Sequence, residues 1–195
     1  MGKIFYVMGK SSSGKDTLFQ DLKREFPQLR TIVLYTTRPI REGEKDGIEY
    51  FFVEEEKLDV FRKAGRLIEE RAYDTIHGIW RYATVDDGQI CLEEADYLAI
   101  GTLESYNRLK AYFGSDCVIP LYVEVEDGER LKRALAREER QESPRYEELC
   151  RRFLADAKDF SEENLREAGI SKRFYNENRS QCFKEMAEEI KHGKF

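Results

Sequence analysis

The feature that most constrains the fold is a glycine- and serine-rich loop, Gly9-Lys10-Ser11-Ser12-Ser13-Gly14-Lys15-Asp16-Thr17. Residues 3–8 before it have the apolar, β-branched and aromatic content of a buried strand. Residues 17–26 after it carry apolar side chains at helical spacing. Glycines let such a loop turn tightly, so that its backbone N–H groups and the helix N-terminus face a phosphate group. The alternative is a Gly/Ser turn that merely starts a helix, but the strand and helix around it favour a phosphate loop.

The order of residues in this loop predicts the donor half of a phosphoryl transfer from ATP. We expect Lys15 to reach the β- and γ-phosphates, and a hydroxyl after it to hold Mg²⁺. Asp16 follows the lysine directly, where the standard pattern has Ser or Thr, so Thr17 is the expected Mg²⁺ ligand and Asp16 a residue able to reach metal or acceptor. The predicted ATP-binding residues of the loop are Gly9, Ser11, Ser12, Ser13, Gly14, Lys15, Asp16 and Thr17.

The remaining sequence alternates expected strands and helices, which is typical of an α/β fold with a parallel sheet. Residues 31–35 are almost wholly apolar and predict a strand buried on both faces. Further strands are expected at 97–101, 118–124 and 172–175, and helices at 103–113, 129–139, 145–160 and 181–191. Between them, a strand at 50–53, a helix at 56–64 and a hairpin of residues 67–75 and 79–85, turning at His77 and Gly78, form an insertion beside the main sheet.

Composition narrows the class of protein. With 195 residues, 41% of them hydrophobic and 37% charged, the chain suits one globular domain. A net charge of −6 argues against binding to nucleic acid polymers or membrane surfaces, which need a positive field. No signal peptide or membrane-spanning run is expected. Four widely spaced cysteines and two histidines give no zinc-ligand pattern, so we expect reduced thiols in a cytoplasmic protein.

A second anion site is indicated by residues 35–53, YTTRPIREGEKDGIEYFFV. Arg38 and Arg41 leave the end of an expected strand, and Tyr50 follows on the next one. Guanidinium groups bind phosphate bidentately, so this set suits an acceptor that carries its own phosphate. Taken alone, the two arginines are better explained as surface ion-pair partners of the neighbouring acids.

This segment closely resembles the guanylate kinase family, whose pattern here is TTRxxRxGExDGxxYxFV. The resemblance implies one domain over residues 1–195: a P-loop NTPase-type parallel sheet with helices on both faces, a small mixed α/β acceptor-binding lobe and a helical lid. The implied boundaries are core 1–35, 91–135 and 153–195, lobe 36–90 and lid 136–152. It also implies that Arg38, Arg41 and Tyr50 bind the acceptor's 5′-phosphate.

The resemblance extends to a base-reading subsite. Residues 67–70, LIEE, are similar to the segment that carries a base-reading glutamate; Glu69 is favoured over Glu70. A carboxylate suits guanine because it accepts from N1–H and the exocyclic amine. Tyr82-Ala83-Thr84 is similar to the family's Tyr-Gly-Thr/Ser, which makes Tyr82 a phosphate contact and Thr84 a base contact, with ordinary hairpin alternation as the alternative.

Two departures bear on the acceptor. Ala99 and Gly101 stand where the family has acidic residues for guanine recognition, and Glu104 lies one helical step further on. The GKDT sequence at the phosphate loop is also similar to that of ribose 1,5-bisphosphate kinases. The identity of the acceptor is therefore left open by the sequence.

Arginines of the expected lid complete the predicted site. The resemblance matches Arg137, Arg152 and, with a blurred register, Arg140 to lid arginines, and Asn176 to an adenine contact. A mobile lid that brings arginines over the phosphates neutralises charge and excludes water. The alternatives are two solvated helices with Glu–Arg pairs, and an Asn-rich turn at Asn176.

These observations predict an ATP-dependent kinase with Lys15, Arg38, Arg137 and Arg152 as catalytic residues. The expected reaction converts GMP or dGMP to the diphosphate, with Mg²⁺ as cofactor and no base catalyst. The alternatives are the same fold acting on another nucleotide or a sugar phosphate, and a catalytically inactive protein-binding module. Lys15 and Thr17, intact here, speak against the last of these. We expect a monomer or a homodimer.

Overall fold

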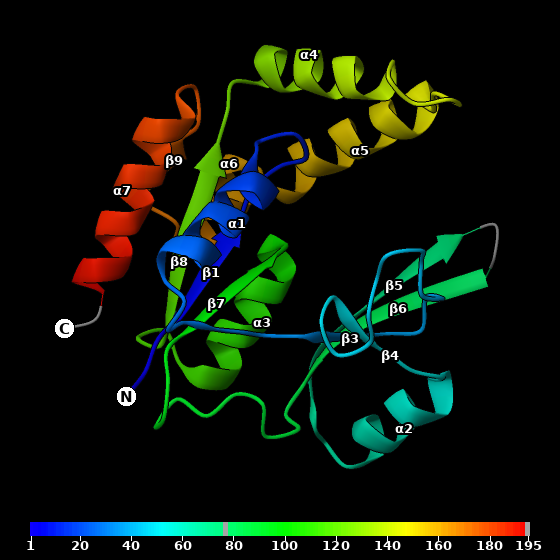
Figure 1. The fold of residues 1–195 in the computed structure, drawn as a ribbon, viewed down its shortest axis with the longest axis vertical. Coiled ribbons are helices and arrows are strands. Elements are labelled where there is room, and N and C mark those ends of the chain that lie inside the picture. The colour runs from blue at the N-terminus through cyan, green and yellow to red at the C-terminus, as the bar shows by residue number, and fades with distance from the viewer. Residues whose placement is uncertain (76–77, 194–195) are drawn as a thin grey trace.

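The core of the protein is a parallel sheet (Figure 1). The structure, a computed structural model, describes residues 1–75 and 78–193. The strand order is β2-β7-β1-β8-β9, and every neighbouring pair in it is parallel. The strands are β1 (Ile4–Met8), β2 (Arg30–Thr31), β7 (Tyr97–Gly101), β8 (Val118–Glu124) and β9 (Phe174–Tyr175). The predicted parallel sheet is confirmed.

Strand β1 shows why helices cover both faces of this sheet. All five of its residues are buried, as expected of a central parallel strand. Ile4, Tyr6 and Met8 belong to one hydrophobic cluster, whereas Phe5 and Val7 belong to the other. Helices α3 (Leu103–Phe113) and α6 (Glu162–Glu167) pack in the first cluster, and α1 (Lys15–Glu25) and α7 (Arg179–His192) pack in the second. Helix α6 was not predicted.

A second sheet forms the lobe at the right of Figure 1. Its order is β4-β3-β6-β5, with β3 (Leu34–Thr36) parallel to β4 (Tyr50–Phe52) and antiparallel to β6 (Gly78–Val85). Strand β5 (Leu67–Thr75) pairs with β6 as the predicted hairpin. The predicted turn at His77 lies outside the described residues. Helix α2 (Glu55–Lys63) covers one face of this sheet through Leu58 and Phe61.

The single buried strand predicted at 31–35 is wrong. The segment is divided: Thr31 pairs with β7 in the core sheet, whereas Leu34 pairs with β4 in the lobe sheet. Ile32, between them, packs against the core cluster, and Tyr35 belongs to the lobe cluster. The run is apolar because it serves two hydrophobic clusters in turn, a situation that hydrophobicity cannot distinguish from one buried strand.

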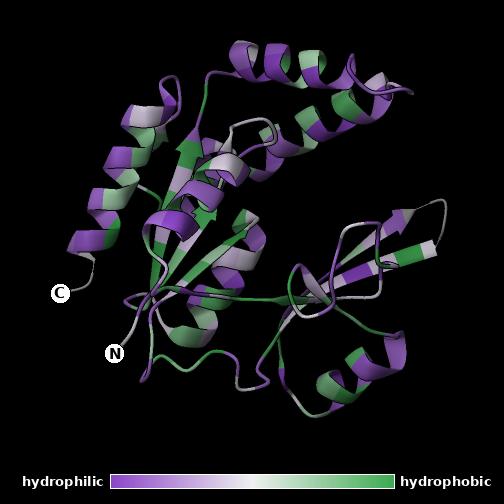
Figure 2. Cartoon of the chain, viewed as in Figure 1, coloured by the Kyte–Doolittle hydropathy of each residue, from purple (hydrophilic) through white to green (hydrophobic). Residues whose placement is uncertain are grey.

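Two charged helices, α4 (Asp127–Glu138) and α5 (Tyr146–Asp159), project beyond the core sheet and confirm the predicted helix pair. Hydrophobic colour concentrates on the central strands, whereas these two helices are mostly hydrophilic (Figure 2). No residue of α5 is buried. Over the described ranges, none of the helices has the length and apolar character needed to cross a membrane.

Candidate functional site

The phosphate loop lies at the carboxyl end of β1, where strands of a parallel sheet present ligand sites. Gly14 has φ of 84° and directly precedes α1, and Ser12 has φ of 62°, an uncommon value for a residue with a side chain. A Cβ atom at Gly9 would collide with the Val123 carbonyl of β8. Gly9 is therefore required by close packing against the backbone of β8, and Gly14 is favoured because its backbone is left-handed.

Two features make this loop ready for an anion. The N-terminus of α1 has no side-chain cap, so its first N–H groups are available to a ligand. Among the described residues, the buried hydroxyls of Ser12 and Ser13 have no hydrogen-bond partner. Buried polar groups are normally satisfied, so unpaired ones at a helix N-terminus are consistent with a site that a phosphate completes.

Lys15, Asp16 and Thr17 follow Gly14 in the first turn of α1. The Lys15 ammonium lies 3.3 Å from an Asp16 carboxylate oxygen, and Asp16 and Thr17 are both exposed. Mg²⁺ at nucleotide sites takes one or two protein oxygens and otherwise phosphate and water. The described residues contain no cluster of three or more potential metal ligands, so this sparse donor set is the one available. Asp16, beside the lysine, and the predicted Thr17 are both candidate protein ligands for Mg²⁺.

Asn176 supports the phosphate loop from behind. Its side-chain amide donates to the Ser13 carbonyl at 2.7 Å, and the residue is 5% exposed. A Cβ at Gly14 would collide with the same amide. The structure thus brings Asn176 to the predicted donor site, in a position where it holds the loop.

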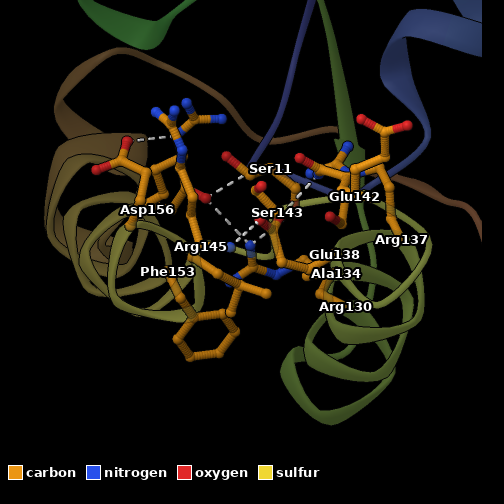
Figure 3. Close-up of a pocket in the computed structure, with 15 residues that line it drawn as sticks. Ser11, Arg130, Ala134, Arg137, Glu138, Glu142, Ser143, Arg145, Phe153 and Asp156 are labelled. Atoms are coloured by element: carbon orange, nitrogen blue, oxygen red, sulfur yellow. Dashed lines mark hydrogen bonds and ion pairs between the residues drawn. The ribbon is translucent and has the colours of Figure 1, made fainter.

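Helices α4 and α5 and the phosphate loop enclose a cavity of about 670 Å³ (Figure 3). Arg137 and Arg152, two predicted catalytic residues, line it together with Arg145, which was not predicted. Arg140 is exposed and is not part of the lining. The lining holds four arginines and four acidic residues: Arg130, Arg137, Arg145, Arg152, Glu138, Glu142, Glu148 and Asp156. The arginines of the predicted lid are therefore matched by acidic residues around this cavity.

Part of that balance is local pairing on α5. The Glu148 carboxylate accepts from Arg151 at 2.7 and 2.8 Å and from Arg152 at 2.7 Å. The hydrogen bonds from Arg151, reinforced by Arg152, lower the pKa of Glu148 to about 2. Arg152 is thus held by a neighbour on its own helix rather than aimed freely into the cavity.

A buried arginine joins the two helices to the phosphate loop. Arg130 of α4 is 1% exposed and donates to the Ser11 carbonyl at 2.9 Å and to Asp156 of α5 at 3.3 Å. Asp156 in turn accepts from the Ser11 N–H at 2.8 Å. Asp127 and the ring of Phe153, 4.6 Å away, complete the surroundings of the guanidinium. We call Ser11, Arg130 and Asp156 the lid-root clamp; the close-up in Figure 3 shows the three together.

The predicted acceptor residues lie mostly on one face of the lobe sheet. Glu69 faces Thr84 and Arg71 faces Tyr82 across the β5–β6 pair, so these four side chains share a face. Tyr82 also faces Thr36 of β3. Glu70 lies on the opposite face, where its carboxylate pairs with Arg62 of α2 at 2.7 Å. This alternation places Glu69, and not Glu70, among the other predicted acceptor residues.

The predicted phosphate-binding cluster is assembled at one end of this face. The Arg38 guanidinium lies 5.3 Å from the Tyr50 ring, and the Tyr50 and Tyr82 rings are 5.6 Å apart. Arg38 is 4% exposed and forms a bidentate pair with Glu44 at 2.8 and 2.9 Å. Glu44 also accepts from the Arg41 N–H, which shapes the loop, while the Arg41 residue is exposed. The side chains of Arg38, Tyr50 and Tyr82 therefore form one cluster, and Arg41 lies at its solvent-exposed rim.

Comparison with known proteins shows a likeness to guanylate kinases in part of the sequence. The guanylate kinase family model matches residues 1–85. A guanylate kinase of Tropheryma whipplei (strain Twist) is 36% identical over 78 residues, which are 40% of this chain and 39% of that relative. A guanylate kinase of Rhodopseudomonas palustris (strain ATCC BAA-98 / CGA009) is 33% identical over 121 residues, 60% of this chain and 52% of the relative. The chain thus aligns with about half or less of the length of these relatives.

The structural likeness covers far more of the chain. The crystal structure of guanylate kinase from Anaplasma phagocytophilum matches 98% of this chain and 85% of that one, with a TM-score of 0.65 and 17% identity. The chain has the guanylate kinase fold. The expected resemblance is confirmed, in sequence over the first 85 residues and in fold over nearly the whole chain.

Within this fold, the residues predicted to read the base are arranged differently from expectation. Glu69 accepts from Arg71 at 3.0 and 3.4 Å and from the Thr84 hydroxyl at 2.9 Å. At Gly101, where the family resemblance led us to expect an acid, a Cβ would collide with the hydroxyl of Tyr6. The Tyr6 side chain of β1 thus occupies the space that an acidic side chain at position 101 would need.

Sequence reasoning missed Arg71, Arg130, Arg145 and Asp156. Arg71 sits two residues from Glu69 on an expected strand, so period-2 alternation alone would have placed it on the same face. Asp156 lies four residues after Arg152 on an expected helix and so shares its side of the helix. For Arg130 and Arg145, charge alone gave no signal, because both helices are rich in charged residues.

Proposed function

We propose that this protein transfers the γ-phosphoryl group of ATP to a purine nucleoside monophosphate, with GMP or dGMP as the favoured acceptor. The observation that carries the proposal is the pairing of two anion sites in one guanylate kinase fold. One is the phosphate loop at Lys15, and the other is the Arg38, Tyr50 and Tyr82 cluster. Strand β5 packs against α3 and joins the lobe to the core that carries the loop.

The chemistry needs positioning more than covalent help. An oxygen of the acceptor's 5′-phosphate attacks the γ-phosphorus of ATP, and the bond to the β–γ bridging oxygen breaks, so that ADP leaves. Lys15 and the N–H groups of the loop bind the donor phosphates, while Arg38 and the rim residue Arg41 hold the acceptor phosphate. Arg137 and Arg152, from the proposed lid at residues 136–152, stabilise the charge of the moving phosphoryl group. Arg140 and Asn176 stay ATP-side residues of the proposal, Asn176 by holding the loop.

Mg²⁺, with Asp16 as its protein ligand, would neutralise charge on the β- and γ-phosphates. Glu69 and Thr84 form the base subsite. We place the protein in the cytoplasm, acting as a monomer or homodimer on small molecules and not on nucleic acid or membranes. Four cysteines without disulfides suit that place.

A sugar phosphate is the second candidate acceptor. Two observations favour it: Asp16 follows the loop lysine, and the base subsite lacks the expected acids at Ala99 and Gly101. The same fold would then transfer the phosphoryl group to an acceptor without a base.

A coupled ADP-release assay with ATP, Mg²⁺ and a panel of acceptors separates these candidates. We expect turnover with GMP and dGMP, its loss in Lys15→Ala by at least about 10²-fold, and a raised acceptor KM in Arg38→Ala with normal ATP binding. Turnover with ribose phosphates but none with GMP or dGMP above the ATPase background would overturn the proposal.

A further inference from the structure

The base subsite contains an ion pair that changes what it can recognise. Both Glu69 oxygens are already engaged, one by the Arg71 Nε at 3.0 Å and the other by the Thr84 hydroxyl at 2.9 Å. The Glu69 side chain is 2% exposed, and that of Arg71 is 14% exposed. The carboxylate is therefore shielded by the guanidinium that neutralises it.

Reading the 2-amino group of guanine requires free hydrogen-bond acceptors. The N1–H and the 2-amino group are both donors, so a site that recognises them presents carboxylate or carbonyl oxygens. Glu69 is shielded, and the acids expected at positions 99 and 101 are absent. The Tyr6 hydroxyl fills the space at Gly101, and burial raises the pKa of Tyr6 well above its ordinary value, so an uncharged hydroxyl stands where the family resemblance implies a carboxylate.

Arg71 offers donors in the same place. It faces Tyr82 across the strand pair, so it lies between the proposed phosphate cluster and Glu69. It also lines a cavity of about 720 Å³ between β5 and α3. Its Nε and Nη2 point to Glu69, and within the described part of the chain no hydrogen bond engages Nη1. A guanidinium donor beside an open cavity recognises an acceptor atom, such as a carbonyl oxygen.

We propose that Arg71 is the specificity-determining residue of the acceptor site, where it reads the 6-oxo group of a purine monophosphate and leaves the 2-amino group unread. This inference rests on the proposed nucleotide kinase function. A 6-oxopurine presents O6 to the guanidinium, whereas a 6-aminopurine presents a donor to a donor. IMP, which has the oxo group and lacks the 2-amino group, is then an acceptor comparable to GMP.

The test measures kcat/KM for GMP, IMP and AMP, with ribose 5-phosphate as a baseless acceptor, and the equilibrium binding of GMP and IMP by calorimetry. For the wild-type protein we expect IMP within about tenfold of GMP, and AMP lower by at least about 10³-fold. A GMP preference above about 100-fold would show that the 2-amino group is read and would overturn the inference.

Arg71→Met releases Glu69, so the ratio of GMP to IMP in kcat/KM should rise by at least about tenfold, with the change mainly in KM. The double variant Glu69→Gln/Arg71→Met buries no unpaired charge and keeps the test valid if the single variant folds poorly; it should lose the discrimination against AMP. Arg62→Met is the matched control, because it removes the partner of Glu70 on the opposite face. An unchanged GMP-to-IMP ratio in Arg71→Met, or AMP still excluded by the double variant, would overturn the role of Arg71.

Failure of the underlying function looks different. In that case no nucleotide releases ADP above the ATPase background, although Lys15-dependent ATP binding persists. Failure of the present inference shows as ADP release with GMP but not with IMP. Preferential turnover of ribose 5-phosphate would overturn both.

Discussion

At the scale of single residues, the phosphate loop departs from the standard pattern at one position. Asp16 takes the place where the standard pattern has a hydroxyl residue, and its carboxylate lies 3.3 Å from the Lys15 ammonium. In the proposed function, this carboxylate adds a negative charge beside the bound phosphates. A cation such as Mg²⁺ between the carboxylate and the phosphates would offset their repulsion.

We therefore expect Asp16→Asn to weaken ATP binding by about tenfold in the presence of Mg²⁺, because a charged ligand is lost. Without Mg²⁺ the same variant should bind ATP as well as or better than the wild type, since repulsion is removed. Thr17→Val serves as the comparison and should change both affinities little. Calorimetric titration of ATP with and without Mg²⁺ measures each value. A larger effect of Thr17→Val than of Asp16→Asn would restore Thr17 as the metal ligand.

The placement of single residues was predictable where a local motif contains them. Lys15 lies at the start of the helix after its loop, as predicted, and Arg38 and Tyr50, from a continuous 18-residue pattern, lie together. Period-2 alternation puts Arg71 on the same face as Glu69, but it does not show that the two side chains form an ion pair. The filling of the Gly101 site by Tyr6 depends on the register of β1 against β7, which no local pattern contains.

At the scale of elements, the lid-root clamp ties two helices to the donor loop. The Asp156 carboxylate bridges the Ser11 N–H and the Arg130 guanidinium, so α5 is attached where the loop begins. Arg152 lies one helical turn before Asp156, which means that the clamp also sets the position of a proposed catalytic arginine.

Asp156→Ala should lower the free energy of unfolding by about 1–3 kcal/mol, because charge-assisted hydrogen bonds are lost while Arg130 keeps Asp127. It should also raise the KM for ATP by about three- to tenfold through a displaced loop and Arg152. Urea denaturation and steady-state kinetics measure the two effects. Exposed Glu147 on the same helix gives the control variant Glu147→Ala, expected within about 0.5 kcal/mol of wild type. If the two variants had the same unfolding free energy and the same KM for ATP, the clamp would have no role in stability or in ATP binding.

Elements were predicted well where periodicity is strong. The strands at 97–101 and 118–124 and the helix at 103–113 have the observed bounds. Residues 31–35 were predicted wrongly, because an apolar run gives no sign of crossing from one sheet to another. The short helix α6 has six residues, too few for a helical pattern to stand out.

At the scale of the whole molecule, acidic side chains held by arginines set the response to pH. Arg151 and Arg152 lower the pKa of Glu148 to about 2 from an ordinary value of 4.5, so this carboxylate stabilises the fold only while ionised. Its contribution is complete above about pH 4.5 and is lost as the pH falls toward about 2.

The free energy of unfolding should therefore fall less between pH 6 and pH 3 in Glu148→Gln than in the wild-type protein. The effect is modest because the side chain is 37% exposed and solvent screens the pair. Urea denaturation at the two pH values measures it, with Glu147→Gln as the control. An identical acid response of Glu148→Gln and wild type would show that the pairs on α5 contribute nothing to folding.

The contact between Ser13 and Asn176 has a consequence for the order in which the protein is made. The phosphate loop is synthesised first, yet the side chain that supports it lies 163 residues later in the chain. A ribosome-bound chain that has not yet exposed β9 carries the glycines, the lysine and the serines of the loop but not their support. Competence to bind ATP should thus arise late, when strand β9 docks beside β8, so that a half-made chain does not engage the nucleotide pool of the cell.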